Sequence, residues 1–431
     1  MAPLLDTLLA LNPWWTDRPF ETGIVRDRYF ARLRSYLDSR EIVVVTGVRR
    51  AGKTTLLYQC IDDLIRTRGV PARQILFVNF DEPGLLDGDD PIGRILETYR
   101  REVYAGEDPY LVFDEVQNVP GWERQLKALY DRRQAHLVVS GSSAALLDTS
   151  LSGLLSGRYL PLPVYPLDFA EYLAFTGHPA PVDPLALAAA RYDLIHRLRD
   201  YLDAGGFPRA ALEPDPMLRA DLLSAYFDSI VQRDIVLANT VRDVRGLHAL
   251  LSTLFANVST LISYRRLAEQ LGLDVSTVRE YLWFATRARV LFEVPFFSYK
   301  VSVQNRNNRK CYCIDTGLRN AVAFRFAPDE GRLLENLVFL HLVRRGGEVY
   351  YWKGTGEVDF VWKRPDHGLV AINVTATDEV PPRESAALRE FAEAHGDLVR
   401  DLIILTADTE GTDGSIRLVP LWRWLLEQDP I

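Results

Sequence analysis

Apolar, β-branched runs in the first 170 residues have the length and composition of buried strands. They are "IVVVT" at 42–46, "YLVFDEVQ" at 110–117 and "AHLVVSGSS" at 135–143, and a further run lies within "LSGRYLPLPVYPLDF" at 155–169. The first run leads through a glycine-containing turn into "LLYQCIDDLI", which we interpret as a helix. This alternation predicts an α/β fold with a parallel sheet, where ligands bind at the carboxyl ends of the strands.

Residues 262–294 have the pattern of two helices joined by a tight turn. Gly272 is expected to end the first helix and Ser276 to cap the second. This pattern is typical of a helix-turn-helix motif. From about Arg309 onward, strand patterns alternate with a long helix that begins near Glu330, so we expect a small α/β domain. The apolar positions with helical spacing are Leu267, Leu271, Val278 and Leu282.

The chain has 431 residues and a formal net charge of −8. This length exceeds what one compact core supports and predicts several domains, and the net charge argues against indiscriminate coating of nucleic acid. Its cysteines, Cys60, Cys311 and Cys313, have no zinc-ligand spacing, so we interpret them as reduced thiols. The N-terminal segment does not resemble a signal peptide and no apolar run is long enough to cross a bilayer, so we expect a cytoplasmic protein without membrane contact.

The turn after the first strand matches the pattern G-x-x-x-x-G-K-[ST], which predicts a phosphate-binding loop. Its backbone N–H groups and the following helix N-terminus favour bound phosphate. We expect Lys53 to reach the β- and γ-phosphates of ATP and the Thr54 hydroxyl to bind Mg²⁺. The expected nucleotide-binding residues of the loop are Gly47, Val48, Arg49, Arg50, Ala51, Gly52, Lys53, Thr54 and Thr55.

Acidic and hydroxyl side chains stand at the ends of the next two buried runs. Asp114 and Glu115 end the second run, where the first carboxylate would hold Mg²⁺ and the second would polarise the attacking water. Ser140 ends the third run and is a candidate sensor of the γ-phosphate. Ser142 and Ser143 fit helix capping equally well.

A candidate for action in trans is Arg158, which directly precedes the fourth run. In an assembled ATPase, an arginine at this place can present its guanidinium to the γ-phosphate of a neighbouring subunit. Arg49 and Arg50 in the loop are rival candidates for this role, and an ordinary solvated surface charge is the alternative for Arg158.

The motifs together resemble the prokaryotic AAA+ ATPases near the STAND branch that carry a C-terminal domain of unknown function. They include "NPWW", "GVRRAGKTTLL", "LVFDEVQNVPGWE", "SGRYLPLPVYPLDFAEYL", "GGFPRA", "CYCIDTGLRNA", "LLENLVFLHLVRRGGEVYYW" and "GEVDFVW". The resemblance implies an AAA+ domain at 1–170, a helical lid at 171–240, a winged helix at 241–308 and a restriction-endonuclease-like α/β domain at 309–431. It also places Pro208 in the lid near the nucleotide, with Arg209 where an acidic or small residue is expected.

The expected winged helix is a candidate nucleic-acid interface, because the start of a second helix can reach base edges. Asp274 and Glu280 lie in the same region, and a spacer or protein-contact role is an equal alternative. The candidate nucleic-acid residues are Arg265, Arg266, Ser276, Thr277 and Arg279.

A nuclease of the restriction-endonuclease type needs two acids followed by E-x-K on an adjacent strand. Glu335 and Asp359 fit the first two requirements, but the E-x-K position carries Asn373, Val374 and Thr375. Lys353 and Lys363 are rival sources of the lysine, although each is more simply a solvated residue. We therefore expect this domain to be inactive as a nuclease and to serve in binding or assembly.

These motifs leave functions of different classes open. The first is a Mg²⁺-dependent ATPase that remodels duplex or branched DNA or a nucleoprotein complex. We expect this ATPase to be a homo-oligomer, with a hexamer as the expected state. The second is an ATP-controlled signalling switch of the STAND kind that recruits a protein partner. The third is a nuclease gated by ATP. The acidic net charge favours the switch, whereas the helix-turn-helix and the nuclease-like pattern favour DNA.

Overall fold

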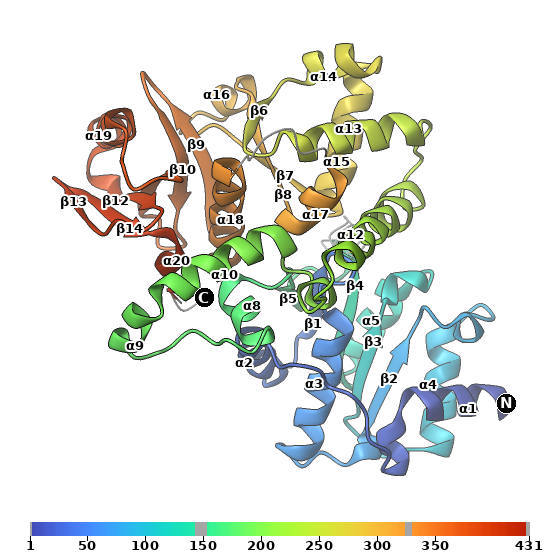
Figure 1. Ribbon diagram of the computed structural model, residues 1–431. Helices are drawn as coiled ribbons and strands as arrows, with labels where there is room; N and C mark the ends of the chain where they lie inside the picture. Colours follow the sequence, from blue (N-terminus) through green and yellow to red (C-terminus); the bar gives the residue numbers. More distant parts are fainter. Residues whose placement is uncertain (1, 143–152, 324–329, 428–431) are drawn as a thin grey trace. The chain divides into compact units, whose positions relative to one another are not determined.

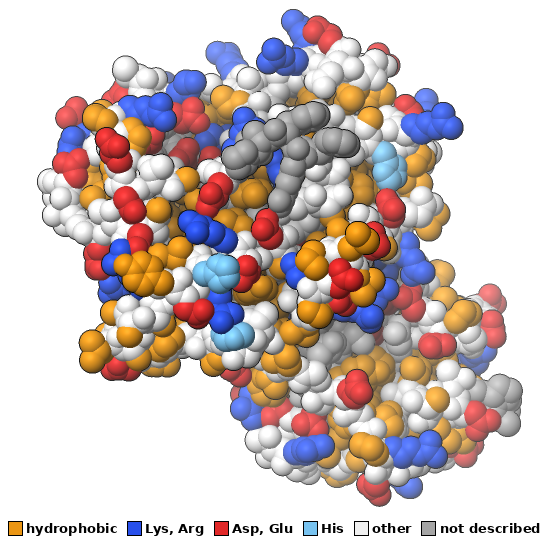
Figure 2. Space-filling view, viewed as in Figure 1, with side chains coloured by type: hydrophobic (Ala, Val, Ile, Leu, Met, Phe, Trp, Pro, Cys, Tyr) orange, Lys and Arg blue, Asp and Glu red, His pale blue; other side chains and the backbone are white. Residues whose placement is uncertain are grey.

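The computed structural model describes residues 2–142, 153–323 and 330–427. The chain divides into two compact units, Met1–Val164 and Tyr165–Ile431, which we call unit 1 and unit 2. In the described residues, no helix combines the length and apolar character needed to span a membrane. Figure 2 shows acidic and basic side chains intermixed over the face in view.

Unit 1 is built on a parallel five-stranded sheet of order β2-β3-β4-β1-β5. Figure 1 shows α3 on one side of this sheet and α4 and α5 on the other. Its strands are β1 (Ile42–Gly47), β2 (Ile75–Asn79), β3 (Tyr110–Asp114), β4 (His136–Ser142) and β5 (Tyr159–Pro163). Its described α-helices are α1 (Ala2–Leu11), α2 (Asp27–Leu37), α3 (Lys53–Arg66), α4 (Pro91–Glu102) and α5 (Trp122–Asp131).

The "NPWW" segment protects the edge strand of this sheet. Asn12 pairs with β2 through both of its amide atoms, donating from Nδ2 to the Phe77 carbonyl at 2.9 Å and accepting the Phe77 N–H at 2.7 Å. The indoles of Trp14 and Trp15 both donate to the Ile75 carbonyl, at 3.2 and 2.8 Å. Backbone groups at a sheet edge would otherwise be open to pairing with another chain, so this motif has a structural role.

Unit 2 begins with helices that share a hydrophobic core with the C-terminal sheet. Leu173 and Leu198 from these helices belong to the same buried cluster as Leu340 and Trp422. The helices are α8 (Phe169–Phe175), α9 (Pro184–Ala189), α10 (Arg191–Ala204), α11 (Pro208–Ala211), α12 (Pro216–Ile230) and the π-helical segment η5 (Val231–Val236).

A three-stranded antiparallel sheet of order β6-β8-β7 follows. Its elements, in chain order, are α13 (Val244–Ala256), β6 (Thr260–Ile262), α14 (Tyr264–Leu271), α15 (Val275–Arg287), β7 (Leu291–Val294), α16 (Val301–Arg306) and β8 (Arg309–Cys313). Because β8 is the central strand of this sheet, the expected domain boundary between residues 308 and 309 is wrong: it cuts the sheet apart. The expected cap at Ser276 is also wrong, because α15 starts at Val275 and Asp274 holds the N-cap position.

The chain ends in a mixed six-stranded sheet of order β13-β14-β12-β11-β10-β9. Its strands are β9 (Glu348–Lys353), β10 (Glu357–Lys363), β11 (Leu369–Val374), β12 (Val399–Thr406), β13 (Gly411–Asp413) and β14 (Ile416–Pro420). The accompanying helices are α17 (Thr316–Val322), α18 (Glu330–Arg345), α19 (Pro382–His395) and α20 (Leu421–Trp424). The expected α/β class, with a parallel sheet, helical segments and a separate C-terminal α/β part, is confirmed.

Candidate functional site

The loop between β1 and α3 has the backbone form that a phosphate cradle requires. Gly52 has φ 97°, a conformation that favours glycine, and the neighbouring Arg50 also has a positive φ of 68°. A Cβ added at Gly47 would lie 2.2 Å from the Val164 carbonyl oxygen, so only glycine fits at the end of β1. Ala51 is buried, and its carbonyl accepts a hydrogen bond from the guanidinium of Arg26 at 3.0 Å.

The structure brings the expected magnesium and sensor residues together at the carboxyl ends of the strands. The Thr54 hydroxyl donates to Oδ2 of Asp114 at 2.7 Å, and Ser140 Oγ donates to the other carboxylate oxygen, Oδ1. Asp114 and Ser140 are fully buried. Burial, together with the nearby Glu115 carboxylate, raises the pKa of Asp114 above its usual value. The site therefore concentrates negative charge that a bound cation would stabilise.

Lys53 lies in the middle of this site with weak protein partners. Its ammonium donates to the carbonyls of Gly47 at 3.1 Å and Val48 at 3.4 Å, and Nζ is 3.9 Å from Oε1 of Glu115. Backbone carbonyls are neutral acceptors, so a phosphate oxygen would compete well for these N–H groups. The ammonium of Lys53 is therefore available to bind a phosphate oxygen in the loop.

Glu115 adopts a left-handed backbone conformation, with φ 53°. Its side chain is also held by Gln117, whose Nε2 donates to Oε2 at 2.6 Å. Neither the role of Gln117 nor that of Arg26 was predicted from the sequence. Gln117 could have been suspected because it follows Glu115 by two residues, whereas nothing in the motif marks Arg26, which lies 25 positions before Ala51.

Arg158 lies at the end of the sheet opposite to this site. Its carbonyl accepts from the N–H of Ile42, the first residue of β1, whereas the phosphate loop follows the last residue, Gly47. Five residues of strand separate the two ends by about 16 Å. The side chain is 35% exposed, and its Nε is 3.3 Å from a carboxylate oxygen of Asp131. Arg158 therefore cannot reach the phosphates of its own chain along this strand.

The other loop residues and the expected lid residue are placed as follows. Val48 is buried, Arg49, Thr54 and Thr55 are partly exposed, and Arg50 is exposed. Ser142 is the last residue of β4, and Ser143 lies outside the described residues. Pro208 is the first residue of α11 and belongs to unit 2.

Packing within unit 2 accounts for the "GGFP" motif that contains Pro208. Gly206 donates its N–H to Oδ2 of Asp315 at 2.6 Å, and a Cβ at Gly205 would lie 2.2 Å from Oδ1 of that carboxylate. Burial raises the pKa of Asp315 to about 6. Sequence reasoning missed this pairing between "GGFP" and "IDTGL", because residues more than 100 positions apart give no local signal.

The candidate nucleic-acid residues lie on α14 and the start of α15. Arg265, Arg266, Ser276 and Arg279 are exposed, and Thr277 is partly exposed. The guanidinium of Arg279 lies 5.3 Å from the centre of the Tyr264 ring. The segment between β7 and β8 adds the exposed Lys300 and Arg306, which sequence reasoning did not include.

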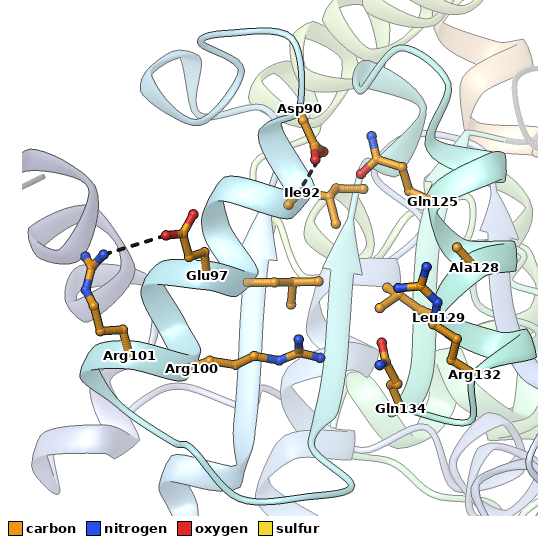
Figure 3. A pocket seen from close by; sticks show the side chains of 12 residues that line it. Asp90, Ile92, Glu97, Arg100, Arg101, Gln125, Ala128, Leu129, Arg132 and Gln134 are labelled. Atoms are coloured by element: carbon orange, nitrogen blue, oxygen red, sulfur yellow. Dashed lines mark hydrogen bonds and ion pairs between the residues drawn. The ribbon is translucent and has the colours of Figure 1, made fainter.

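A hollow of about 580 Å³ lies between α4 and α5, away from the phosphate loop. Figure 3 shows Arg100 of α4 and Arg132, which follows α5, beside it. Ile92, Leu96 and Leu129 supply apolar lining. None of the expected nucleotide-binding residues lines this hollow.

An AAA domain model matches residues 39–173, and two domains of unknown function match residues 195–329 (DUF8612) and 330–424 (DUF4143). The structure of the Walker-type ATPase PABY2304 of Pyrococcus abyssi covers 72% of this chain and 99% of its own, with a TM-score of 0.43 and 14% identity.

Relatives extend over nearly the whole sequence. An uncharacterized protein of Haemophilus influenzae is 31% identical over 356 residues, which are 80% of this chain and 85% of that protein. An uncharacterized protein of Methanocaldococcus jannaschii is 29% identical over 407 residues, which are 90% of this chain and 88% of that protein. The chain belongs to the same family as the Haemophilus influenzae protein, and its AAA-type P-loop ATPase domain is followed by two domains of unknown function.

Proposed function

We propose that the chain binds ATP with Mg²⁺ and hydrolyses it, with Lys53, Thr54, Asp114, Glu115 and Ser140 in the roles expected above. The observation that carries the proposal is the convergence of these side chains at the carboxyl ends of β1, β3 and β4. The lysine supplies positive charge where the β- and γ-phosphates would lie, and the helix N-terminus of α3 adds to it. Glu115 is placed to polarise a water molecule, and Gln117 orients its carboxylate.

The residues fit a magnesium ion. The Thr54 hydroxyl and the Asp114 carboxylate are hard oxygen donors 2.7 Å apart, which suits a cation that takes one or two protein ligands and keeps several waters. Burial and the neighbouring Glu115 carboxylate raise the pKa of Asp114, and they outweigh the hydroxyls of Ser140 and Thr54 and the charge of Lys53. When bound with ATP, Mg²⁺ would neutralise developing charge on the phosphates.

The test is ATP hydrolysis with Mg²⁺ by wild type and Lys53→Ala. We expect hydrolysis by the wild type and loss of both nucleotide binding and turnover in the variant, measured by phosphate release and fluorescent-nucleotide titration. Arg66→Ala is the control, since it removes an exposed cation of the same unit that pairs with Asp62 on α3. Equal activity of Lys53→Ala and wild type would contradict the proposal.

We further propose that the active form is an oligomer, with a hexamer as the expected state, in which Arg158 acts on the neighbouring subunit. This proposal is supported by the exposed position of Arg158 at the end of the sheet away from its own phosphate loop. Mixing inactive Arg158→Ala with inactive Lys53→Ala protein should restore part of the hydrolysis at mixed interfaces. No recovery, with both variants still assembling, would assign Arg158 a structural role.

For unit 2 we propose nucleic-acid binding through α14, α15 and the segment before β8. The order α13-β6-α14-α15-β7-β8 with sheet order β6-β8-β7 supports a winged-helix interpretation, and the exposed arginines supply positive charge. Exposed Glu269, Asp274 and Glu280 nearby limit this charge, so binding would be confined to a small patch.

The test compares ATP hydrolysis without nucleic acid and with linear duplex, single-stranded and branched DNA. Stimulation by any of these supports a DNA remodeller, and its loss in Arg265→Ala/Arg266→Ala would assign it to α14. Arg383→Ala/Arg389→Ala on α19 is the control with the same change in net charge. Hydrolysis that no DNA changes, with no binding in low salt, would favour the ATP-controlled switch instead.

A further inference from the structure

Strand β8 carries a lysine into the C-terminal part of unit 2. Alternate side chains of a strand point to opposite faces, so Lys310 and Tyr312 share one face of β8 and Cys311 and Cys313 the other. Tyr312 stacks on Phe339 of α18, with ring centres 4.4 Å apart. Lys310 is only 3% exposed. A lysine this deeply buried needs partners for its charge.

Carboxylates from two elements surround the ammonium of Lys310. Its Nζ is 3.1 Å from Oε1 of Glu335 on α18, 2.8 Å from Oε1 of Glu357 and 3.1 Å from Oδ1 of Asp359, both on β10. The Tyr312 hydroxyl donates to Oε1 of Glu335 at 2.6 Å. We call Lys310, Glu335, Glu357 and Asp359 the lysine–carboxylate cluster.

Further atoms beside the cluster have hydrogen-bond partners within the chain. The second oxygen of Asp359 accepts the N–H of Val374 at 3.1 Å. Asn373, at the position of the missing acid, accepts the Asp359 N–H at 3.0 Å and donates to Glu384 at 2.7 Å. Burial lowers the pKa of Lys310, but the Asp359, Glu335 and Glu357 carboxylates outweigh it and raise the pKa above its usual value.

The resemblance to restriction endonucleases implies a divalent metal at Glu335 and Asp359, and the residues present do not fit one. Lys310 already contacts an oxygen of each at 3.1 Å, whereas Mg²⁺ and Ca²⁺ bind oxygen at about 2.0–2.6 Å. Over the described part of the chain, no group of three or more His, Cys, Asp or Glu side chains is placed to hold a metal ion. Sequence reasoning offered only Lys353 and Lys363 as substitutes for the lysine that the E-x-K position lacks at this site. Lys310 reaches it from another strand, while Lys353 and Lys363 pair with Glu357 and Glu348 nearer the surface.

We propose that the ammonium of Lys310 is a built-in cation that takes the position of the divalent metal, so that removing this lysine opens the cluster to a metal ion. The carboxylates would then repel one another, and a divalent ion would offset that repulsion. In the intact chain the cluster ties β8 to α18 and β10 and is closed to metal.

The experiment measures Mn²⁺ binding to nucleotide-free, full-length protein by electron paramagnetic resonance of free Mn²⁺. Its second readout is the Mn²⁺-dependent shift of the unfolding temperature. We expect Lys310→Met to gain one site per chain and a higher unfolding temperature with Mn²⁺, and Lys310→Met/Asp359→Asn to lose at least tenfold in affinity. Wild type should show neither effect at this cluster. Wild-type Mn²⁺ binding that Asp359→Asn removes would overturn the proposal, as would Lys310→Met without any gain of binding.

A charge-balanced variant covers the case in which Lys310→Met does not fold without metal. Lys310→Met/Glu357→Gln removes one carboxylate together with the cation, so it should unfold at a higher temperature than Lys310→Met and respond less to Mn²⁺. If the balanced variant is no more stable than Lys310→Met, the charges of the cluster do not interact as proposed and the inference fails.

Discussion

The protein contains two sites where a buried lysine meets acidic side chains, and they differ in how the lysine is satisfied. Lys53 in unit 1 donates to two backbone carbonyls and stays 3.9 Å from its nearest carboxylate oxygen. Lys310 in unit 2 lies within 3.1 Å of three carboxylates. The positive charge of Lys53 can therefore still pair with a ligand, whereas the positive charge of Lys310 is already paired with carboxylates of the fold.

The aspartates of the two sites also differ in whether their partners are neutral or charged. Asp114 is held by the hydroxyls of Thr54 and Ser140, which are neutral donors, and burial together with the Glu115 carboxylate raises its pKa. Asp359 receives an ammonium and a backbone N–H. A site prepared for an external cation is therefore recognised by incompletely compensated charge, because residues that compensate one another have little to gain from a ligand.

The largest expected effect is on stability, and it separates the two lysines. Lys310→Met leaves three carboxylates close together without their cation, and losing one partner of a buried ion pair costs about 3–5 kcal/mol of unfolding free energy. Lys53→Met should change stability by only about 1 kcal/mol, since its hydrogen-bond partners are two neutral backbone carbonyls rather than close carboxylates.

Urea unfolding of both variants, followed by far-ultraviolet circular dichroism, measures this difference. An equal loss of unfolding free energy in Lys310→Met and Lys53→Met would contradict this comparison. Lys310 would then contribute no more to folding than Lys53 does. Lys310→Arg is a useful control that keeps the charge and changes its shape.

The next effect concerns hydrolysis and separates two glutamates. Glu115→Gln should slow ATP turnover by about 10²-fold or more and leave nucleotide binding intact, because it removes the group placed to polarise water. Glu335→Gln is the matched change in the lysine–carboxylate cluster and should leave turnover within about twofold of wild type where the protein stays folded. A wild-type rate in Glu115→Gln would move the base to another residue.

Local patterns in the sequence predicted the fold of unit 1 and marked the side chains that meet at the carboxyl ends of its strands. The loop, the strand that ends at Asp114 and the strand that contains Ser140 were all marked by apolar runs followed by polar residues, and the sheet brings their ends together. The residue roles themselves stay predictions. The position of Arg158 at the opposite end of the sheet follows from strand direction, since it precedes its strand and Gly47 ends one.

The lysine–carboxylate cluster could not be found in this way. Lys310 is 25 positions from Glu335 and 49 from Asp359, and the search for a lysine followed the strand order of an E-x-K motif. Strand β8 was also assigned to the C-terminal domain, although it pairs with β6 and β7. Pairing between strands depends on tertiary packing that no local pattern records.

The smallest expected effect is the change in unfolding free energy when the aspartate of each site is replaced by asparagine. We expect this change to have opposite signs in the two sites. Asp114→Asn should stabilise the nucleotide-free protein by about 1–2 kcal/mol, because the Thr54 and Ser140 hydroxyls can bond an amide as well as a carboxylate and burial disfavours the charge. Asp359→Asn should destabilise by a similar amount, because Lys310 loses an anionic partner at 3.1 Å.

The pH dependence of the stability difference between Asp114→Asn and wild type distinguishes an effect of charge from an effect of packing. The pKa of Asp114 is raised in the folded state, so between the unfolded and folded values the folded protein binds more protons, and stability falls as pH rises through that window. The advantage of Asp114→Asn over wild type should therefore grow as the pH rises and shrink as it falls, as unfolding temperatures from pH 4 to 8 would show. An advantage that does not change with pH would point to packing rather than charge, and a loss of stability in Asp114→Asn would mean that the site is already compensated, like the cluster around Lys310.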